Sequence, residues 1–396
     1  MIAAIGAAAA TTTTIATDPL QPAARLVRGA HAWHNRGMPS PRLCGRALRL
    51  ATTALCLLLG GCASLRYYAH VAHGQTSLLL HRRAIARVVN DPATDPVLAR
   101  RLRLAAQARR FASAQLDLPR NRSYTSYVDL HRPYVAWNVF ATPPYSVEAV
   151  PQCFPIAGCV AYRGYFDQAR AQARASQLKA GGDDVWIGPV PAYSTLGWFA
   201  DPIVSSMLRW DDDDVAGTIF HELAHQKLYV KGDTAFNESF ASFVEQQGLR
   251  EWRKVRELPP PDARAQAIEQ GFTALVLELR DRLKQLYSST HDATALARGK
   301  QARIEAFRRH YAQWRDRRWP GDHRYDAWVA APINNARLLP FGLYDRWTGA
   351  FALLFDRAGH RWEPFYETVR TLADEPKAQR DRRLDGLVDG ADISAR

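Results

Sequence analysis

The stretch from Asp211 to Gln247 limits the fold of this chain more than any other part of the sequence. Residues 221–225 of this stretch read HELAH. Residues four apart lie on one face of a helix, so a helix here presents the imidazoles of His221 and His225 side by side. Two imidazoles in that arrangement are typical zinc ligands. Glu222 lies about 100° round the helix, outside the ligand pair, where its carboxylate can take a proton from an attacking water. The competing interpretation is a chance pair of surface histidines.

The residues around the motif predict one helix from Asp211 to about Gly232. The acidic run Asp211–Asp214 suits a helix N-terminus, because carboxylates cap the free N–H groups there and match the helix dipole. Binding a substrate amine is the alternative role for this run. Gly232 is a favourable residue for the end of the helix. The apolar residues at helical spacing, which bury one face, are Val215, Ile219, Leu223 and Leu228.

A second helix is predicted to begin at Asp233 or Thr234, since both side chains cap helix N-termini. Glu238 falls in its second turn, thirteen positions after His225, and provides the third protein ligand that a catalytic zinc site needs. Glu245 lies seven positions later and returns to the same face. It is a candidate for orienting a ligand from the second shell, with an ordinary polar residue as the alternative. These residues predict one Zn²⁺ per chain.

A wider similarity to known sequences lies in four segments: Cys153–Phe166, Pro191–Pro202, Phe220–Glu245 and Ile333–Trp347. With these segments the chain resembles the bacterial putative zinc aminopeptidase family, whose members are metallopeptidases of the gluzincin type. The similarity extends over nearly the whole chain after residue 61. It implies a membrane-attached, metal-dependent peptidase with a zincin-like fold, in which a small mixed sheet precedes the active-site helix and a helical lobe follows. A glutamate ligand from the next helix, here Glu238, is the gluzincin pattern.

The resemblance also bears on substrate binding. Asn237–Ala241 reads NESFA and is similar to the NEGFA segment of zinc aminopeptidases, which places Asn237 with Glu245 among the residues that support the ligands. Those enzymes hold the substrate amine with the glutamate of a G-x-M-E-N loop, and this chain has no such loop. The nearest candidate strand, Val185–Tyr193, contains no acid, although by resemblance it is expected to line the substrate groove. Aminopeptidase and endopeptidase specificity therefore both stay open.

A tyrosine or histidine from a later segment often stabilises the oxyanion in gluzincins. Tyr344, in the last of the four similar segments, is the candidate for this role. The alternative is a buried structural tyrosine.

The first 61 residues are predicted to be an N-terminal extension followed by a lipoprotein signal peptide. Met38 is the expected true start, because three arginines and the short apolar run Ala51–Leu59 follow it. The segment Leu59-Gly60-Gly61-Cys62 resembles a bacterial lipobox, which implies cleavage before Cys62 and a lipid on its sulfur. Ala63 is not the aspartate that usually retains lipoproteins in the inner membrane. We therefore expect a lipoprotein of the bacterial cell envelope, in the outer membrane and facing the periplasm. An ordinary signal peptide with an incidental cysteine is the alternative.

Two cysteines of the mature chain, Cys153 and Cys159, are predicted to form a disulfide in an oxidising compartment. A second metal site is the alternative, but these residues lack nearby His or Cys partners. The formal net charge is +13, which favours contact with anionic surfaces such as phospholipid. The sequence contains no nucleic-acid-binding motif, so we do not expect it to bind nucleic acid. No feature of the sequence indicates an obligate protein partner.

The expected fold class is α+β and predominantly helical. Residues 62–396 are predicted to form one zinc metallopeptidase domain. A helical pair over 65–118 opens it, and strands at 134–140 and 185–187 with a helix at about 167–180 complete the part up to residue 200. The zinc-site helices occupy 201–250. A helical part follows over 251–376, with two long helices within 262–316, and 377–396 form a mobile charged tail.

These features predict a zinc-dependent peptidase that hydrolyses peptide bonds, with aminopeptidase activity suggested by the resemblance. One alternative is a non-catalytic envelope protein in which zinc is structural. A structural zinc usually has four protein ligands, and only three can be named here, which favours catalysis. The other alternative is an endopeptidase that acts on cell-wall peptides.

Overall fold

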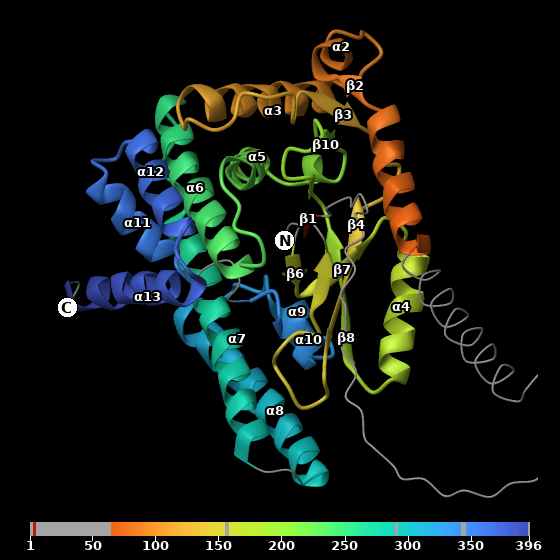
Figure 1. The fold of residues 1–396 in the computed structure, drawn as a ribbon, viewed down its shortest axis with the longest axis vertical. Coiled ribbons are helices and arrows are strands. Elements are labelled where there is room, and N and C mark those ends of the chain that lie inside the picture. The colour runs from red at the N-terminus through yellow and green to blue at the C-terminus, as the bar shows by residue number, and fades with distance from the viewer. Residues whose placement is uncertain (1–2, 5–64, 155–157, 290–291, 342–345, 395–396) are drawn as a thin grey trace, which may run out of the picture. The chain divides into compact units, whose positions relative to one another are not determined.

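The computed structural model describes residues 3–4, 65–154, 158–289, 292–341 and 346–394 (Figure 1). The chain divides into two units, residues 7–72 and residues 1–6 together with 73–396. The elements named below belong to the second unit unless stated otherwise. Cys62 and Tyr344 lie outside the described residues, and so does the whole predicted signal peptide from Met38 to residue 61. Within the described ranges, no helix combines the length and apolar character needed to cross a bilayer.

The protein is α+β and mostly helical, as the sequence predicts. Its main sheet consists of strands β4, Ala136–Thr142, β7, Tyr162–Tyr165, and β8, Asp184–Val190. These strands are antiparallel in the order β7-β4-β8. Helix α4, Gln168–Ala180, contacts all three strands, and the short helix α10, Asn335–Leu338, contacts β4 and β8. This double cover explains why all seven residues of β4 are buried.

Other strands form smaller sheets. One contains β2, Arg83–Ala84, antiparallel to β3, Ser126–Val128, which pairs in parallel with β10, Ile203–Val204. Strand β9, Tyr193–Ser194, pairs with β1, Ala3–Ala4. Strands β5, Gln152–Phe154, and β6, Gly158–Val160, form a hairpin.

The N-terminal helical pair differs from the prediction. Residues 65–80 are helical, but the chain then forms β2 and a separate short helix, α2, Ile85–Val89. The predicted first helix is broken because Arg83 and Ala84 pair with strand β3. Ile85 and Val88 are still buried, from α2. The second helix of the pair, α3, spans Pro96–Ala114 and is capped by Asp95.

Helix α5, Asp212–Lys227, follows the 3-10 helix η1, Met207–Arg209, and packs between α3 and α6, Thr234–Val255. Every residue from Val215 to His225 is buried. A helix covered on several sides needs small or apolar residues around most of its circumference, which this stretch supplies.

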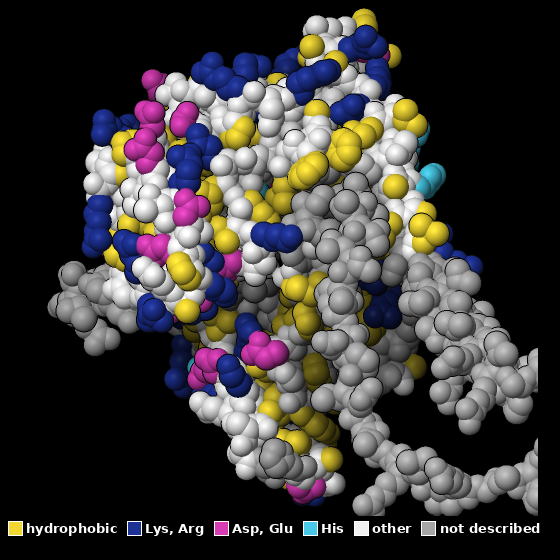
Figure 2. All heavy atoms as spheres, in the orientation of Figure 1, with side chains coloured by type: hydrophobic (Ala, Val, Ile, Leu, Met, Phe, Trp, Pro, Cys, Tyr) yellow, Lys and Arg dark blue, Asp and Glu magenta, His cyan; other side chains and the backbone are white. Residues whose placement is uncertain are grey.

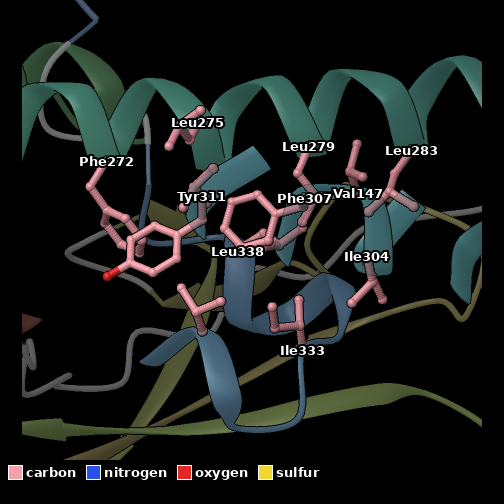
Figure 3. Packing of buried hydrophobic residues seen from close by; sticks show 12 residues of the cluster. Val147, Phe272, Leu275, Leu279, Leu283, Ile304, Phe307, Tyr311, Ile333 and Leu338 are labelled. Atoms are coloured by element: carbon pink, nitrogen blue, oxygen red, sulfur yellow. The ribbon is translucent and has the colours of Figure 1, made fainter. Parts of the chain in front are cut away.

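The two long helices predicted within 262–316 are α7, Ala263–Ser289, and α8, Ala293–Arg318. They pack against each other and against α9, Asp326–Ala330, and α10. Figure 3 shows the shared core, with leucines of α7 facing apolar residues of α8. The labelled residues are Val147, Phe272, Leu275, Leu279, Leu283, Ile304, Phe307, Tyr311, Ile333 and Leu338.

Three helices end the chain: α11, Thr348–Arg357, α12, Trp362–Ala373, and α13, Lys377–Ser394. Helix α13 replaces the mobile tail that the charged sequence predicts. It packs on α11, and Arg380 is buried in an ion pair with Asp233 at 2.5 Å. A buried ion pair far apart in sequence is not visible in the local composition, which is why the prediction differs.

Candidate metal centre

Helix α5 carries the HELAH residues, and its N-cap is Asp211 as predicted. The helix ends at Lys227, earlier than the expected stop at Gly232. Beyond the end, the N–H of Val230 donates to Oδ1 of Asn237, and the carbonyl of Val230 accepts from Nδ2, both at 2.7 Å. Because this side chain satisfies both backbone groups of Val230, that residue needs no helical hydrogen bonds.

Helix α6 begins after Asp233, whose carboxylate accepts a hydrogen bond from the N–H of Phe236 at 3.4 Å. This start places Glu238 in the second turn, facing the histidines of α5. The two helices pack closely against each other. The separation of His225 and Glu238 along the sequence is therefore bridged by one turn between packed helices.

Three ligand-type atoms converge between α5 and α6. Nε2 of His221 lies 3.1 Å from Nε2 of His225 and 3.3 Å from Oε2 of Glu238. Nε2 of His225 lies 3.6 Å from the same oxygen. All three residues are buried, and they are the group of described His, Cys, Asp and Glu residues that could hold a metal ion. Ligands at about 2.1 Å from a tetrahedral zinc lie about 3.4 Å apart, so the triangle has the right size.

The electrostatics of this triangle favour positive charge. Burial alone would lower the pKa of His221, but the hydrogen bonds that its imidazole donates to Glu238 and Glu245 raise this pKa to about 10. Burial would likewise raise the pKa of Glu238, and the two histidines instead lower it to about 2. The same carboxylates that stabilise a proton on His221 would stabilise a divalent cation between these side chains.

Glu245 holds the outer nitrogen of His221. Nδ1 of His221 lies 2.9 Å from Oε2 of Glu245, so the imidazole donates there and turns Nε2 toward the ligand triangle. Gly217, one turn before His221, makes room for this contact. A Cβ at Gly217 would lie 2.9 Å from Oε1 of Glu245 and 3.0 Å from Leu249.

Glu222 is fully buried, and neither of its carboxylate oxygens has a hydrogen-bond partner among the described residues. Burial raises its pKa to about 7, although His225 and His221 favour the charged form. The hydroxyl of Ser194 also favours the charged form but lies outside hydrogen-bond geometry. A buried carboxylate that titrates near neutral pH is suited to both accepting and donating a proton.

A family model described as "Putative aminopeptidase" matches residues 66–384 of the chain. The chain belongs to this aminopeptidase family. No curated protein and no solved structure matches it.

The site of this aminopeptidase-family chain differs in part from its predicted composition. Asn237 supports the turn between α5 and α6 through the backbone of Val230 and touches no ligand atom by hydrogen bond. Cys153 and Cys159 are joined by a disulfide that closes the β5–β6 hairpin. Tyr344 lies outside the described residues, so its place relative to the centre stays a prediction.

Strand β8 packs against β4, α4 and α10, and the residues that line the small cavity beside His225 and Glu238 come from other segments. The expected place of Val185–Tyr193 along a substrate groove stays a prediction. Sequence reasoning missed the residues that line this cavity: Val160, Tyr162, Leu196 and Tyr229. A signal was available, because the first three lie in Cys153–Phe166 and Pro191–Pro202, two of the segments that carry the family resemblance.

Proposed function

We propose that this chain is a zinc-dependent peptidase, with aminopeptidase activity as the family suggests. His221, His225 and Glu238 would hold the zinc, and Glu222 would be the general base. The observation that carries the proposal is the buried triangle of two Nε2 atoms and one carboxylate oxygen, beside a buried carboxylate without hydrogen bonds. Two imidazoles and one carboxylate form a donor set that suits zinc.

The residues support hydrolysis rather than a structural role. Three protein ligands leave one position of a tetrahedral site open, as in catalytic zinc sites. When bound, zinc lowers the pKa of water and polarises a carbonyl. Glu222 accepts the proton of the attacking water and then returns it to the leaving amine. The raised pKa of this side chain near neutral pH fits both steps.

We further propose that the protein acts at the periplasmic face of a bacterial membrane, attached through lipid on Cys62. The lipobox-like segment before Cys62 and the excess of positive charge support this location. An endopeptidase acting on cell-wall peptides is the second candidate, because the chain lacks a G-x-M-E-N loop for a substrate amine.

Peptide cleavage tests the activity. Zinc-loaded protein from Cys62 onward, without lipid, would be incubated with a diverse peptide library, and products would be mapped by mass spectrometry. Stepwise loss from free N-termini would establish an aminopeptidase, whereas internal cuts would establish an endopeptidase.

The Glu222→Gln variant is the matched control for this experiment. It should keep its zinc and lose turnover by roughly 10²- to 10⁴-fold, the usual contribution of a general base. An unchanged rate in this variant would refute the assigned role of Glu222. A zinc-loaded wild-type protein that cleaves no peptide would favour a binding protein with a structural metal.

A further inference from the structure

The small cavity beside the candidate metal centre is lined mainly by uncharged side chains. It has a volume of about 10 Å³, which is room for about one water molecule. His225 and Glu238 form its inner end. The other residues that line it are all uncharged: Val160, Tyr162, Leu196, Tyr229, Thr234 and Asn237.

Separate segments bring these residues together. Val160 ends strand β6, in the hairpin closed by the Cys153–Cys159 disulfide. Tyr162 begins β7, is paired with Phe140 of β4, and its ring centroid lies 5.3 Å from that of Phe140. These contacts fix two walls of the cavity to the sheet and to a covalently closed hairpin.

The α5–α6 turn and the loop after β9 supply the other walls. The ring centroids of Tyr229 and His225 lie 6.3 Å apart, and the two ring planes make an angle of 74°. A tyrosine hydroxyl is ordinarily neutral across the physiological range. Leu196, from the loop after β9, also lines the cavity.

The loop that carries Leu196 combines a fixed base with an exposed apolar tip. The N–H and hydroxyl of Thr195 donate to the buried carboxylate of Asp201, both at 2.9 Å. Leu196 and Gly197 have φ angles of 55° and 82°, in the left-handed region that leucine rarely adopts. The next two side chains, Trp198 and Phe199, are 67% and 39% exposed. Two neighbouring exposed aromatic side chains, two and three residues along the chain from Leu196, offer apolar area to a ligand.

We propose that this cavity is the pocket for an uncharged, apolar side chain of the substrate, on one of the two residues that flank the scissile bond. This inference rests on the proposed peptidase function. A charged side chain would lose its water against walls that provide no opposite charge outside the metal centre, so it would be rejected. An apolar side chain would lose water favourably against Val160, Leu196 and the two tyrosine rings.

Entry of such a side chain requires movement of Leu196, since the present cavity holds only a water-sized group. Gly197 provides the backbone freedom for that movement, because it has no Cβ and its φ angle is already positive. Leu196 is therefore assigned as a residue that determines which side chains are accepted.

Binding and turnover of matched peptides test the pocket. The peptides would be identical except for Leu, Phe, Ala, Lys or Glu at each flanking position. Dissociation constants would be measured by calorimetry on zinc-loaded Glu222→Gln protein, and kcat/KM on wild type. Leu or Phe should be preferred over Lys and Glu at one position by roughly 10-fold or more, as expected for apolar pockets. Equal binding of charged and apolar peptides at both positions would overturn the assignment.

The Leu196→Ala variant tests which residue sets the preference. It enlarges the pocket, so the optimum should move from Leu toward Phe. Leu258→Ala is the control, since Leu258 is a partly exposed leucine outside the cavity lining and should leave the order of peptides unchanged. An unchanged order in Leu196→Ala would refute the role of Leu196.

The two readouts separate this inference from the proposed function. Apolar preference in binding without hydrolysis by wild type would remove the peptidase function and keep the pocket. Hydrolysis without any preference at either flanking position would keep the peptidase and remove the pocket.

Discussion

Gly217 shows that the proposed metal centre depends on a residue that contributes no ligand atom. Its missing side chain lets the carboxylate of Glu245 approach helix α5 and reach Nδ1 of His221. The ligand nitrogen is thereby oriented from a second helix. Supporting contacts of this kind fix the tautomer of a histidine ligand and contribute to metal affinity.

Gly217→Ala should therefore weaken zinc binding. The added Cβ would meet Glu245 at 2.9 Å and displace its carboxylate from His221. We expect a loss of roughly 10- to 100-fold in zinc affinity, the usual effect of removing such a support. Competition with a chromogenic chelator would measure it. Gly349→Ala in α11 is the control, because a Cβ there meets no atom within 4 Å. Equal zinc affinity in the two variants would contradict the role of Gly217.

Asp201 gives a prediction about stability and pH. Burial raises the pKa of this carboxyl from 3.8 to about 7, against the opposing effect of the hydrogen bonds from Thr195. Between about pH 4 and pH 7 the folded protein keeps a proton that the unfolded chain releases. Stability contributed by this group therefore falls as pH rises through that window, by about 4 kcal/mol at most.

Asp201→Asn should remove this dependence. Thermal unfolding would be followed from pH 4.5 to pH 7.5 in wild type and variant. The difference in Tm should move in favour of the variant as pH rises. Asp129→Asn serves as the control at an exposed carboxylate. Parallel Tm curves for wild type and Asp201→Asn would show that Asp201 does not titrate in this range.

At the scale of elements, helix α13 holds the start of the helix that carries Glu238. Asp233 caps α6 and is itself buried, with Arg380 at 2.5 Å and Lys377 at 3.2 Å. The side chains of Asp233 and Arg380 are each only 3% exposed. Burial opposes ionisation of Asp233, and the contacts with Arg380 and Lys377 nevertheless lower its pKa.

Arg380→Ala should destabilise the protein by about 3–5 kcal/mol, because it leaves the carboxylate of Asp233 buried with an exposed lysine as its remaining ion-pair partner. Urea unfolding would measure the change. Arg382→Ala, at an exposed position of the same helix, is the control and should change stability by less than about 0.5 kcal/mol. Similar stabilities for the two variants would show that α13 does not secure α6.

At the scale of the whole molecule, positive charge dominates. The chain carries a formal net charge of +13, and Figure 2 shows Lys and Arg side chains along the upper edge of the face in view, over helix α3. A surface of this sign is attracted to anionic lipid, which is consistent with the proposed attachment through Cys62. The family match over 66–384 begins near the start of the described helix 65–80 and ends within α13. The match therefore includes the first part of α13, residues 377–384, and the larger part of this helix lies beyond it.

The sequence alone determined the parts of the site that depend on local geometry. The spacing of His221, Glu222 and His225 determines which of these side chains share a helix face, because the helical repeat is fixed. The N-cap of α5 at Asp211 was predictable because an aspartate side chain accepts from the free N–H groups of a helix start, and for α6 the same rule left Asp233 and Thr234 as the two candidates. The helical class, the α7–α8 pair and strands β4 and β8 followed from apolar spacing and β-branched residues.

Only the tertiary structure decided the features that join distant residues. The Glu245–His221 contact required a view of how α5 and α6 pack, and the space at Gly217 was invisible in the sequence. The apolar cavity combines Val160, Leu196 and Tyr229 from three segments. Helix α13 depends on a pair between Arg380 and Asp233, far apart in the chain. Local spacing limits which groups a helix can present together, whereas packing between elements decides what each group meets.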